Sequence, residues 1–395
     1  MNYKLQKRTI WIINILFFFI LKSINCEDIL SLDLTIQYGI YNTELQLYNE
    51  NENKIQSQYA NLNLKTSNTY LHLDSLTNLT YYNSYIIEDE EFEIIMLQFN
   101  VGLYFNNKQT TRINIEGSTN SSMSYIVSGI SFAHSFYNYN YSITHQLYND
   151  KKISKLAFTL YPGNSNKIYS SGGKIYFGNA PSHLLKSKLI SSCGITNSKY
   201  WSCNISEIIV SNENNNDHNT LKYIINEPIA FIVHQGFTRV PRDYLNYLGD
   251  NLFKDFLDKK LCWFGRYHSQ YGIMCSYKCK NYNMFEGIKV EFVINGFVFK
   301  REMNDMFVYY EDMMMFEMSY YFDYWNGGLE WEIGGYFLQK YITEFDYEEQ
   351  EIRFYERQDE VNDLFKVKVI IGNVCLLGVG SLLLILILLK LTEVI

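Results

Sequence analysis

The sequence predicts a mostly β fold in two related halves, followed by a C-terminal transmembrane helix. Three observations carry this prediction. Short runs rich in Ile, Val, Tyr and Phe alternate with polar residues, which is the pattern of half-buried strands. Two strand–turn segments look like distant copies of each other. A continuous apolar run lies close to the end of the chain.

Strand patterns dominate the region between the two ends of the chain, and helical patterns are few and short. Many short strands with sparse helices favour a fold built by sheet packing. The helical patterns cover 141–150, 242–260 and 335–342. The clearest strand patterns are "LDLTIQY" (32–38), "RINIEG" (112–117), "KIYFGN" (174–179), "SEIIVSN" (206–212), "IKVEFVING" (288–296) and "EIRFYE" (351–356).

The internal copies are "LNLKTSNTYLHL" (62–73) and "AFIVHQGFTRVP" (230–241). Each has an apolar strand, a small polar turn and a returning strand. Each is followed later by an apolar segment that contains glycine, "YIVSGISFA" (125–133) and "LEWEIGGYFL" (329–338). We expect such a two-fold repeat to place the two turns face to face.

Both ends of the chain carry targeting patterns. Residues 1–26 combine a basic start, a short apolar core and a small-residue end, which predicts a secretory signal peptide; a buried N-terminal helix is the alternative. Residues 369–389 provide about the 20 apolar residues that a bilayer span needs. Lys368 and Lys390 bracket this run, and a removable lipid-anchor signal is the alternative reading. We expect a single-pass membrane protein, its ectodomain extracellular or in the endomembrane lumen, with 357–368 as linker and 390–395 as cytoplasmic tail.

The net charge is −8 and nothing in the sequence resembles a basic nucleic-acid surface, so that class of function is set aside. Five of the seven cysteines lie between the two targeting segments, where an oxidising compartment favours disulfides. Cys193 with Cys203 would close a short loop, and Cys262 with Cys275 or Cys279 another, leaving one thiol over. A metal site is the rival reading, although no histidine pair at ligand spacing accompanies the cysteines, and we expect no cofactor.

Glycosylation is expected on the same secretory route. Four Asn-x-Ser/Thr sequons provide the candidate acceptors, which are Asn78, Asn120, Asn140 and Asn204.

The repeated segments resemble the pepsin-like aspartic proteases, whose hallmark in each lobe is two apolar residues followed by Asp, Thr or Ser, and Gly. The matching stretches here are "NLKTSNT" (63–69) and "IVHQG" (232–236). The flanking segments are similar to the family in order and spacing, and these are 128–161, 171–185, 200–210, 285–299 and 331–356. The resemblance implies a bilobal acid-protease fold, with an N-terminal lobe over 27–190 and a C-terminal lobe over 191–356.

The same resemblance implies two catalytic aspartates, and neither is present. Lys65 and His234 occupy the matching positions. In the adjoining turns, Thr66 and Ser67 follow the first position, and Gln235, Gly236 and Thr238 follow the second. The glycine after the aspartate lets backbone amides approach the carboxylates; Gly236 keeps it and Ser67 replaces it.

The hairpin that covers the substrate in this family matches "EIIMLQFNVGLYF" (93–105). Ile95 then takes the position of the family's tyrosine, and Met96 and Gln98 replace glycines. The interval from Lys65 to the turn at Ser128 also looks shorter than usual, so we expect the first lobe to lack part of its cleft wall.

The substitutions at the two aspartate positions decide the predicted chemistry. Lysine has only donors, and histidine is neutral or positive, so the two cannot share a proton as two carboxyls do. We expect His234 to hydrogen-bond within its turn; a pH-dependent ligand contact and a general-base role are the alternatives. A replacement dyad of Asp74 and Asp243 is disfavoured because each lies nine residues past the vacated position.

The sequence therefore predicts a membrane-anchored, non-catalytic relative of the pepsin-like proteases that binds a peptide or protein in its cleft. The resemblance alone implies an aspartic-type endopeptidase, which stands as the alternative if the active site is unusual. A structural surface glycoprotein is the third hypothesis. Fold alone does not choose among them.

Overall fold

The structure is a computed structural model of the 395-residue chain. It describes residues 29–49, 54–64, 70–72, 81–88, 93–105, 108–118, 129–131, 142–165, 169–185, 187–197, 200–212, 220–267, 270–281, 284–310, 313–321 and 330–357. The chain divides into two compact units, Met1–Tyr355 and Glu356–Ile395, and the fold below is that of the first.

The predicted membrane and targeting segments lie outside the described residues. Over the ranges given above, no helix is both long enough and apolar enough to cross a bilayer. The proposed signal peptide (1–26), linker (357–368, of which only residue 357 is described), spanning helix (369–389) and tail (390–395) therefore stay predictions, as do the acceptors Asn78, Asn120 and Asn140. Asn204 is described, and its side chain is exposed on a strand of the second sheet.

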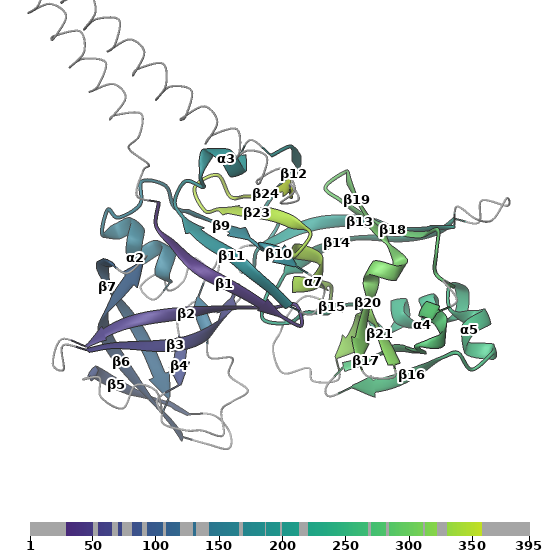
Figure 1. Ribbon diagram of the computed structural model, residues 1–395, viewed down its shortest axis with the longest axis horizontal. Helices are drawn as coiled ribbons and strands as arrows, with labels where there is room; N and C mark the ends of the chain where they lie inside the picture. The colour runs from purple at the N-terminus through teal and green to yellow at the C-terminus, as the bar shows by residue number, and fades with distance from the viewer. Residues whose placement is uncertain are drawn as a thin grey trace, which may run out of the picture. The chain divides into compact units, whose positions relative to one another are not determined.

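The first sheet gathers strands from both ends of the described chain. In Figure 1 the purple strands β1 and β2 and the yellow strands β23 and β24 share this sheet with β9 and β11. Its described strands are β1 (Ser31–Gln37), β2 (Ile40–Asn49), β3 (Lys54–Asn63), β4 (Tyr70–His72), β5 (Tyr81–Glu88), β6 (Glu93–Phe105), β7 (Lys108–Ser118), β8 (Gly129–Ser131), β9 (Ala157–Tyr161), β10 (Asn164–Ser165), β11 (Tyr169–Phe177), β12 (Leu189–Gly194), β23 (Tyr341–Asp346) and β24 (Glu351–Glu356).

The second sheet lies wholly in the later part of the chain, and its central strands are antiparallel neighbours. Its described strands are β13 (Ser202–Asn212), β14 (Leu221–Phe231), β15 (Thr238–Arg239), β16 (Cys262–Tyr267), β17 (Gln270–Ser276), β18 (Ile288–Ile294), β19 (Phe297–Glu302), β20 (Phe307–Tyr310), β21 (Met313–Tyr321) and β22 (Glu332–Ile333).

The described helices are short. Those of the first half are α2 (Ile143–Asn149) and α3 (Ser182–Leu185). Those of the second half are α4 (Arg242–Asn251), α5 (Lys254–Asp258), α6 (Lys278–Asn281), the 3₁₀ turn η4 (Met303–Met306) and α7 (Gly335–Leu338). Of these, α2, α4, α5 and α7 lie within the predicted ranges, with 242–260 divided between α4 and α5, whereas α3, α6 and η4 were not predicted. The helix predicted over 335–342 is too long, because the chain enters strand β23 at Tyr341 and pairs with β9.

The two internal copies adopt the same strand arrangement, which confirms the predicted repeat. In the first copy, β8 pairs parallel to β3 and antiparallel to β4, while β4 pairs parallel to β7. In the second, β22 pairs parallel to β14 and antiparallel to β15, while β15 pairs parallel to β21. The short later segments are thus the central strands of two equivalent motifs.

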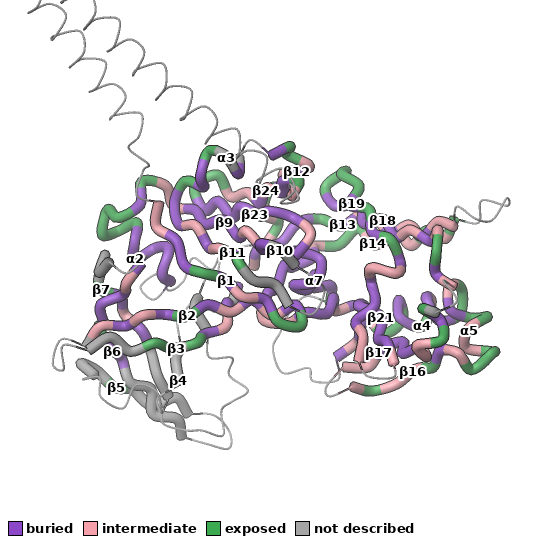
Figure 2. The backbone as a smooth tube through the Cα atoms, viewed as in Figure 1, coloured by how far each residue is buried: buried purple, intermediate pink, exposed green. Residues whose placement is uncertain are grey.

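A continuous apolar core joins the two sheets. Trp201, which is fully buried just before β13, packs against Phe158 of β9 and Phe345 of β23, with ring centroids 5.9 Å and 5.1 Å away. Figure 2 shows buried residues along β9, β23 and α7. The first sheet and the start of the second are therefore held in one hydrophobic interior rather than in two separate ones.

The structure shows which cysteines form disulfides, a pairing that the sequence left open. Cys193 of β12 bonds to Cys203 of β13, and Cys262 of β16 bonds to its cross-strand neighbour Cys275 of β17. Cys279 is the free, buried cysteine among the described residues, and its Sγ lies 3.8 Å from the Leu261 carbonyl. Burial raises the pKa of this thiol above its ordinary value. The prediction of two bridges and a leftover thiol is confirmed.

Candidate functional site

The candidate site is the turn of residues 234–237, which follows strand β14. Ile232 and Val233 are completely buried and continue the strand into the core, so the next residue emerges where the chain turns. His234 and Gln235 are half-buried there. The Gln235 and Gly236 carbonyls accept hydrogen bonds from the amides of Gly335 and Tyr336, at 2.9 Å and 3.0 Å. The middle of the turn is thereby fixed to the start of α7.

Thr238 ties the returning strand to the same segment. Its side chain is buried, and its Oγ1 accepts a hydrogen bond from the Gly334 amide at 3.3 Å. A Cβ atom on Gly334 would lie 2.2 Å from the Phe237 carbonyl oxygen, so only glycine fits at this crossing. The pair of glycines after β22 is thus required by the close approach of two backbone segments.

Gly236 meets a part of the chain that the sequence analysis did not connect with it. A Cβ atom on Gly236 would lie 2.1 Å from the Tyr38 carbonyl oxygen. Tyr38 and Gly39 form the turn between β1 and β2, both with positive φ, and the amide of Tyr41 donates to the Val233 carbonyl at 2.9 Å. The first hairpin of the chain therefore packs directly on the turn that carries His234.

Tyrosines form one wall beside this turn, a feature that the sequence analysis missed. Tyr38 stacks on Tyr310 with centroids 6.4 Å apart, and Tyr310 also contacts Tyr267 at 4.5 Å. Burial, with the neighbouring tyrosines, raises the pKa of Tyr310 above its usual range. The chain is rich in tyrosine throughout, so composition could not single these three out; their contact depends on tertiary structure.

A buried ion pair lies on the strands behind the turn and was also missed. Glu332 of β22 is almost completely buried, and its Oε2 lies 3.9 Å from Nη1 of Arg239 on β15. Tyr321 of β21 accepts a hydrogen bond from the Gln270 amide, and burial, followed by Glu332, raises the pKa of that tyrosine. A glutamate inside the apolar stretch "LEWEIGG" is the one sequence signal that could have indicated this pair.

The first-lobe half of the predicted site is described only in part. Leu64 is buried at the end of the strand that leads to the first turn, but Lys65, Thr66 and Ser67 lie outside the described residues. The segment predicted to cover the substrate is strand β6, which pairs antiparallel with β5 and places Ile95 opposite Ile86; its covering role stays a prediction. The structure thus brings together the second-lobe residues His234, Gln235, Gly236 and Thr238, while Ile95 belongs to a hairpin of the first sheet.

The suggested replacement acids do not join this site within the described residues. Asp243 is exposed in the first turn of helix α4, and Asp74 lies outside the described ranges. The side chains that the structure places at the second turn are therefore an imidazole, an amide and a hydroxyl, with Glu332 held by Arg239 behind them.

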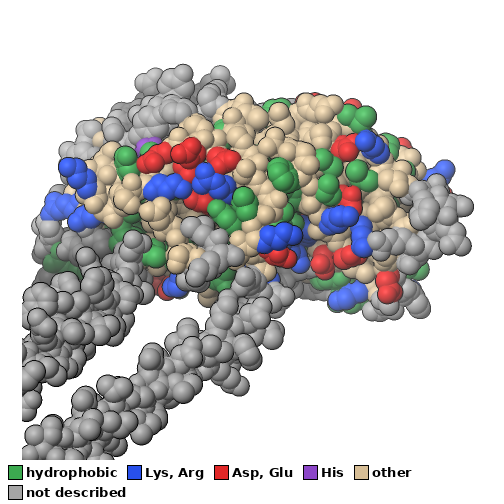
Figure 3. Space-filling model, turned by 90° about the horizontal axis from the view of Figure 1, so that it is seen from above, with side chains coloured by type: hydrophobic (Ala, Val, Ile, Leu, Met, Phe, Trp, Pro, Cys, Tyr) green, Lys and Arg blue, Asp and Glu red, His purple; other side chains and the backbone are tan. Residues whose placement is uncertain are grey.

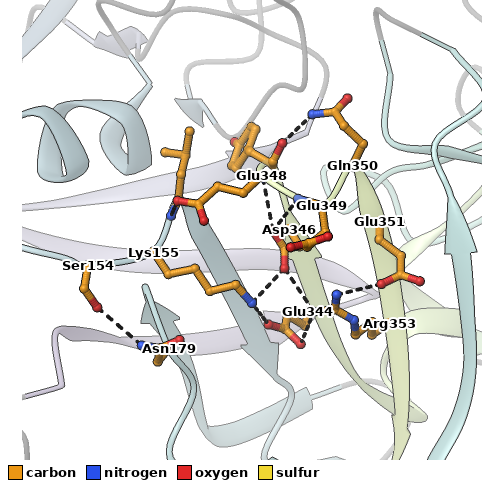
Figure 4. Close-up of polar contacts among 12 residues, drawn as sticks. Ser154, Lys155, Asn179, Glu344, Asp346, Glu348, Glu349, Gln350, Glu351 and Arg353 are labelled. Carbon is orange, nitrogen blue, oxygen red and sulfur yellow. Dashed lines mark hydrogen bonds and ion pairs between the residues drawn. The ribbon is translucent and has the colours of Figure 1, made fainter.

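Among the described residues, a dense ionic cluster lies elsewhere, on β23, β24 and the residues before β9. Lys155 and Arg353 lie over Glu344 and Asp346, and Figure 4 shows the four side chains converging. On the face that Figure 3 shows, acidic side chains lie directly beside basic ones. Over the described ranges, no group of three His, Cys, Asp or Glu side chains has the arrangement of a metal site.

Comparison with known proteins agrees with the two-motif β fold described above. The family model for eukaryotic aspartyl proteases matches residues 56–356. Among solved structures, the chain is similar to an aspartic proteinase from Irpex lacteus, with a TM-score of 0.54 and 12% identity, over 83% of this chain and 97% of that one. At this identity the likeness concerns the fold. No curated protein sequence matches the chain.

Proposed function

We propose that this chain, which belongs to the eukaryotic aspartyl protease family, is a non-catalytic member that binds a peptide or protein partner in its cleft. One observation carries the proposal: the turn after β14, at the centre of the second strand motif, presents His234, which the sequence resemblance aligns with a family aspartate.

The chemistry of the family explains why this replacement matters. Two carboxyl groups that share one proton activate a water molecule and polarise the scissile carbonyl. An imidazole is neutral or positive, and an ammonium group has donors only, so the pair of His234 and Lys65 provides no ionised carboxylate at either position. Two such groups facing each other repel when both are protonated.

Retention of the surrounding scaffold supports a binding role. The second turn is held by Gly334, Gly335 and Thr238, and the segment that the resemblance assigns to the covering hairpin pairs as β6 with β5. A chain that had lost all use for the cleft would be free to lose these tight backbone contacts. We therefore propose that the cleft binds an extended peptide without cutting it.

We further propose that the protein is anchored in a membrane by residues 369–389, with its folded part outside the cell or in a lumen. The two disulfides support an oxidising compartment. The exposed Asn204 sequon supports passage through the secretory route, and it supports a glycoprotein with at least this acceptor.

A peptide-library experiment tests the binding role. The purified full-length chain is incubated with a random peptide library, and mass spectrometry identifies what is retained and whether it is intact. Retention of intact peptides is expected. Release of cleaved peptides would establish the endopeptidase alternative, and no retention at all would favour the structural glycoprotein.

A matched pair of variants locates the binding. His234→Trp places a large ring in the cleft and is expected to abolish retention. Asp250→Trp places the same ring on an exposed position of α4 and is expected to leave retention unchanged. Equal retention by both variants would contradict binding at the turn.

A further inference from the structure

A small polar pocket lies between β19, η4, β20, β21 and α7, the helix that holds the turn. Its volume is about 30 Å³. The charged and polar side chains that line it include Arg301, Asp305, Glu317, Tyr336 and Lys340, with Phe307 among the apolar ones. A pocket needs about 10–15 Å³ of such volume to hold one water molecule, so this one is large enough.

Arg301 contributes a donor that the described residues do not use. Its Nη1 and Nη2 donate to the two Glu317 oxygens at 3.1 Å and 2.8 Å, and Nη2 also donates to the Asp305 carbonyl at 3.0 Å. The side chain is almost completely buried, yet its Nε has no hydrogen-bond partner among the described residues. A guanidinium held end-on by one carboxylate directs this remaining N–H away from the pair.

Tyr336 contributes a second donor from α7. Its side chain is 4% exposed, and its hydroxyl likewise has no hydrogen-bond partner among the described residues. Burial, followed by the nearby Tyr310 and Glu317, raises the pKa of this phenol far above its ordinary value, so the hydroxyl keeps its proton. Buried polar groups in folded proteins are almost always hydrogen-bonded to protein or to ordered water.

We propose that this pocket binds an ordered water molecule that accepts hydrogen bonds from Arg301 Nε and from the Tyr336 hydroxyl. The charges of the lining favour a neutral occupant. Arg301 is balanced by Glu317, and Lys340 Nζ lies 3.4 Å from Asp305 Oδ2. An anion would therefore enter a site with no surplus positive charge, whereas water can also donate to the carboxylates.

The Tyr336 ring connects the proposed water to the candidate site. A Cβ atom on Gly236 would lie 2.7 Å from Tyr336 Cε2, and one on Gly39 would lie 3.0 Å from Tyr336 Cδ1. The ring therefore supports both the turn of residues 234–237 and the first hairpin. The water fixes the hydroxyl end of this ring, which makes Tyr336 a positioning residue for the turn.

The variant Tyr336→Phe tests the proposal by the direction in which it changes the melting temperature. If the hydroxyl binds water, its removal costs a hydrogen bond, and the melting temperature of the full-length chain falls by about 1–3 °C. Tyr355→Phe, which removes a hydroxyl that donates to Glu344 at 2.9 Å, gives the matched reference for such a loss. A rise in the melting temperature of Tyr336→Phe, or no change, would overturn the proposal.

Two further readouts identify the occupant and its effect on the turn. A high-resolution crystal structure is expected to show water density within hydrogen-bond distance of both donors, and an empty pocket would overturn the proposal. A stability that rises when chloride replaces a larger anion at constant ionic strength would also overturn it. The backbone amide of residue 336 donates to the Gly236 carbonyl. We expect this amide to exchange its hydrogen faster in Tyr336→Phe than in the native chain, and at the native rate in Tyr355→Phe.

Discussion

The end of strand β14 and the end of strand β23 use ionisable side chains in opposite ways. After β14 the chain presents His234, at the position that the sequence predicts to match a family aspartate. At the end of β23, two acids stand two residues apart on one face of the strand, beneath two cations. Lys155 Nζ lies 2.8 Å from Glu344 and 2.7 Å from Asp346, and Arg353 Nη1 lies 3.4 Å and 3.0 Å from the same carboxylates.

The comparison shows that neighbouring carboxylates do not by themselves make an acid dyad. A dyad shares a proton because no cation neutralises its second charge. In the β23 cluster, burial alone would raise the pKa of Asp346, but hydrogen bonds from Lys155 and from the Glu349 amide hold it below its ordinary 3.8. Both acids there are paired with cations, whereas the turn after β14 presents an imidazole.

Removing an acid from the β23 cluster should give the largest effect. Asp346 is completely buried and also accepts hydrogen bonds from the amides of Glu348 and Glu349. Asp346→Ala leaves the cations and these amides without that partner, so we expect the free energy of unfolding to fall by about 3 kcal/mol. Chemical denaturation of the full-length chain measures this change.

The control for that prediction is an exposed ion pair on the same sheet. Asp33 pairs with Lys174 at 2.6 Å, but the Asp33 side chain is 85% exposed. We expect Asp33→Ala to change the unfolding free energy by less than about 1 kcal/mol. Equal losses of unfolding free energy in Asp346→Ala and Asp33→Ala would mean that the buried cluster stabilises the fold no more than an exposed ion pair does.

The backbone packing at the second turn should give the next largest effect. A Cβ atom at Gly236 would collide with the Tyr38 carbonyl, so we expect Gly236→Ala to destabilise the chain by about 2 kcal/mol through overpacking. Gly194→Ala is the control, because a Cβ atom there meets no atom within 4 Å. Equal stability of Gly236→Ala and Gly194→Ala in urea denaturation would contradict the close packing at Gly236.

Acidification should reveal the ionised state of the β23 cluster. Because the folded-state pKa of Asp346 is lowered, its ionic contribution is fully present above the unfolded value near 3.8 and is lost as the pH falls below it. We expect stability in the native chain to drop below that pH, and the drop to be smaller in Asp346→Asn. A pH dependence that is identical in the two proteins would show that this carboxylate is not the titrating group.

The smallest effect is expected at His234 itself. The side chain is half-buried at a turn whose backbone is held by hydrogen bonds from the Gly335 and Tyr336 amides, so we expect the turn to tolerate truncation of the imidazole. We expect His234→Ala to change the unfolding free energy by about 0.5 kcal/mol. A loss as large as that of Asp346→Ala would instead make His234 a structural residue.

Patterns that are local in sequence predicted much of this fold. Alternating apolar residues indicated the strands, and the repeated strand–turn segments predicted two equivalent motifs, because both signals are contained within a few residues. The extent of α7 was predicted wrongly, since pairing of Tyr341–Asp346 with β9 is a long-range interaction that overrides a helical pattern. Cys262 could not be assigned to Cys275 rather than Cys279 until the β16–β17 register was known.

The candidate site shows the same limit. Family motifs located His234 and Gly236, but the reason proposed for the glycine was incomplete, because its close neighbour Tyr38 is almost two hundred positions earlier. The tyrosine wall and the Arg239–Glu332 pair were missed for the same reason. Contacts between segments far apart in the chain leave no mark in a local pattern.

Acid proteolysis by the full-length chain tests the central claim most directly. Denatured protein substrate is incubated at acidic pH with the native chain, with His234→Ala and with the double variant Lys65→Asp/His234→Asp. We predict that the native chain and His234→Ala yield no cleavage products, while any gained activity is confined to the double variant. Cleavage by the native chain that disappears in His234→Ala would contradict the account.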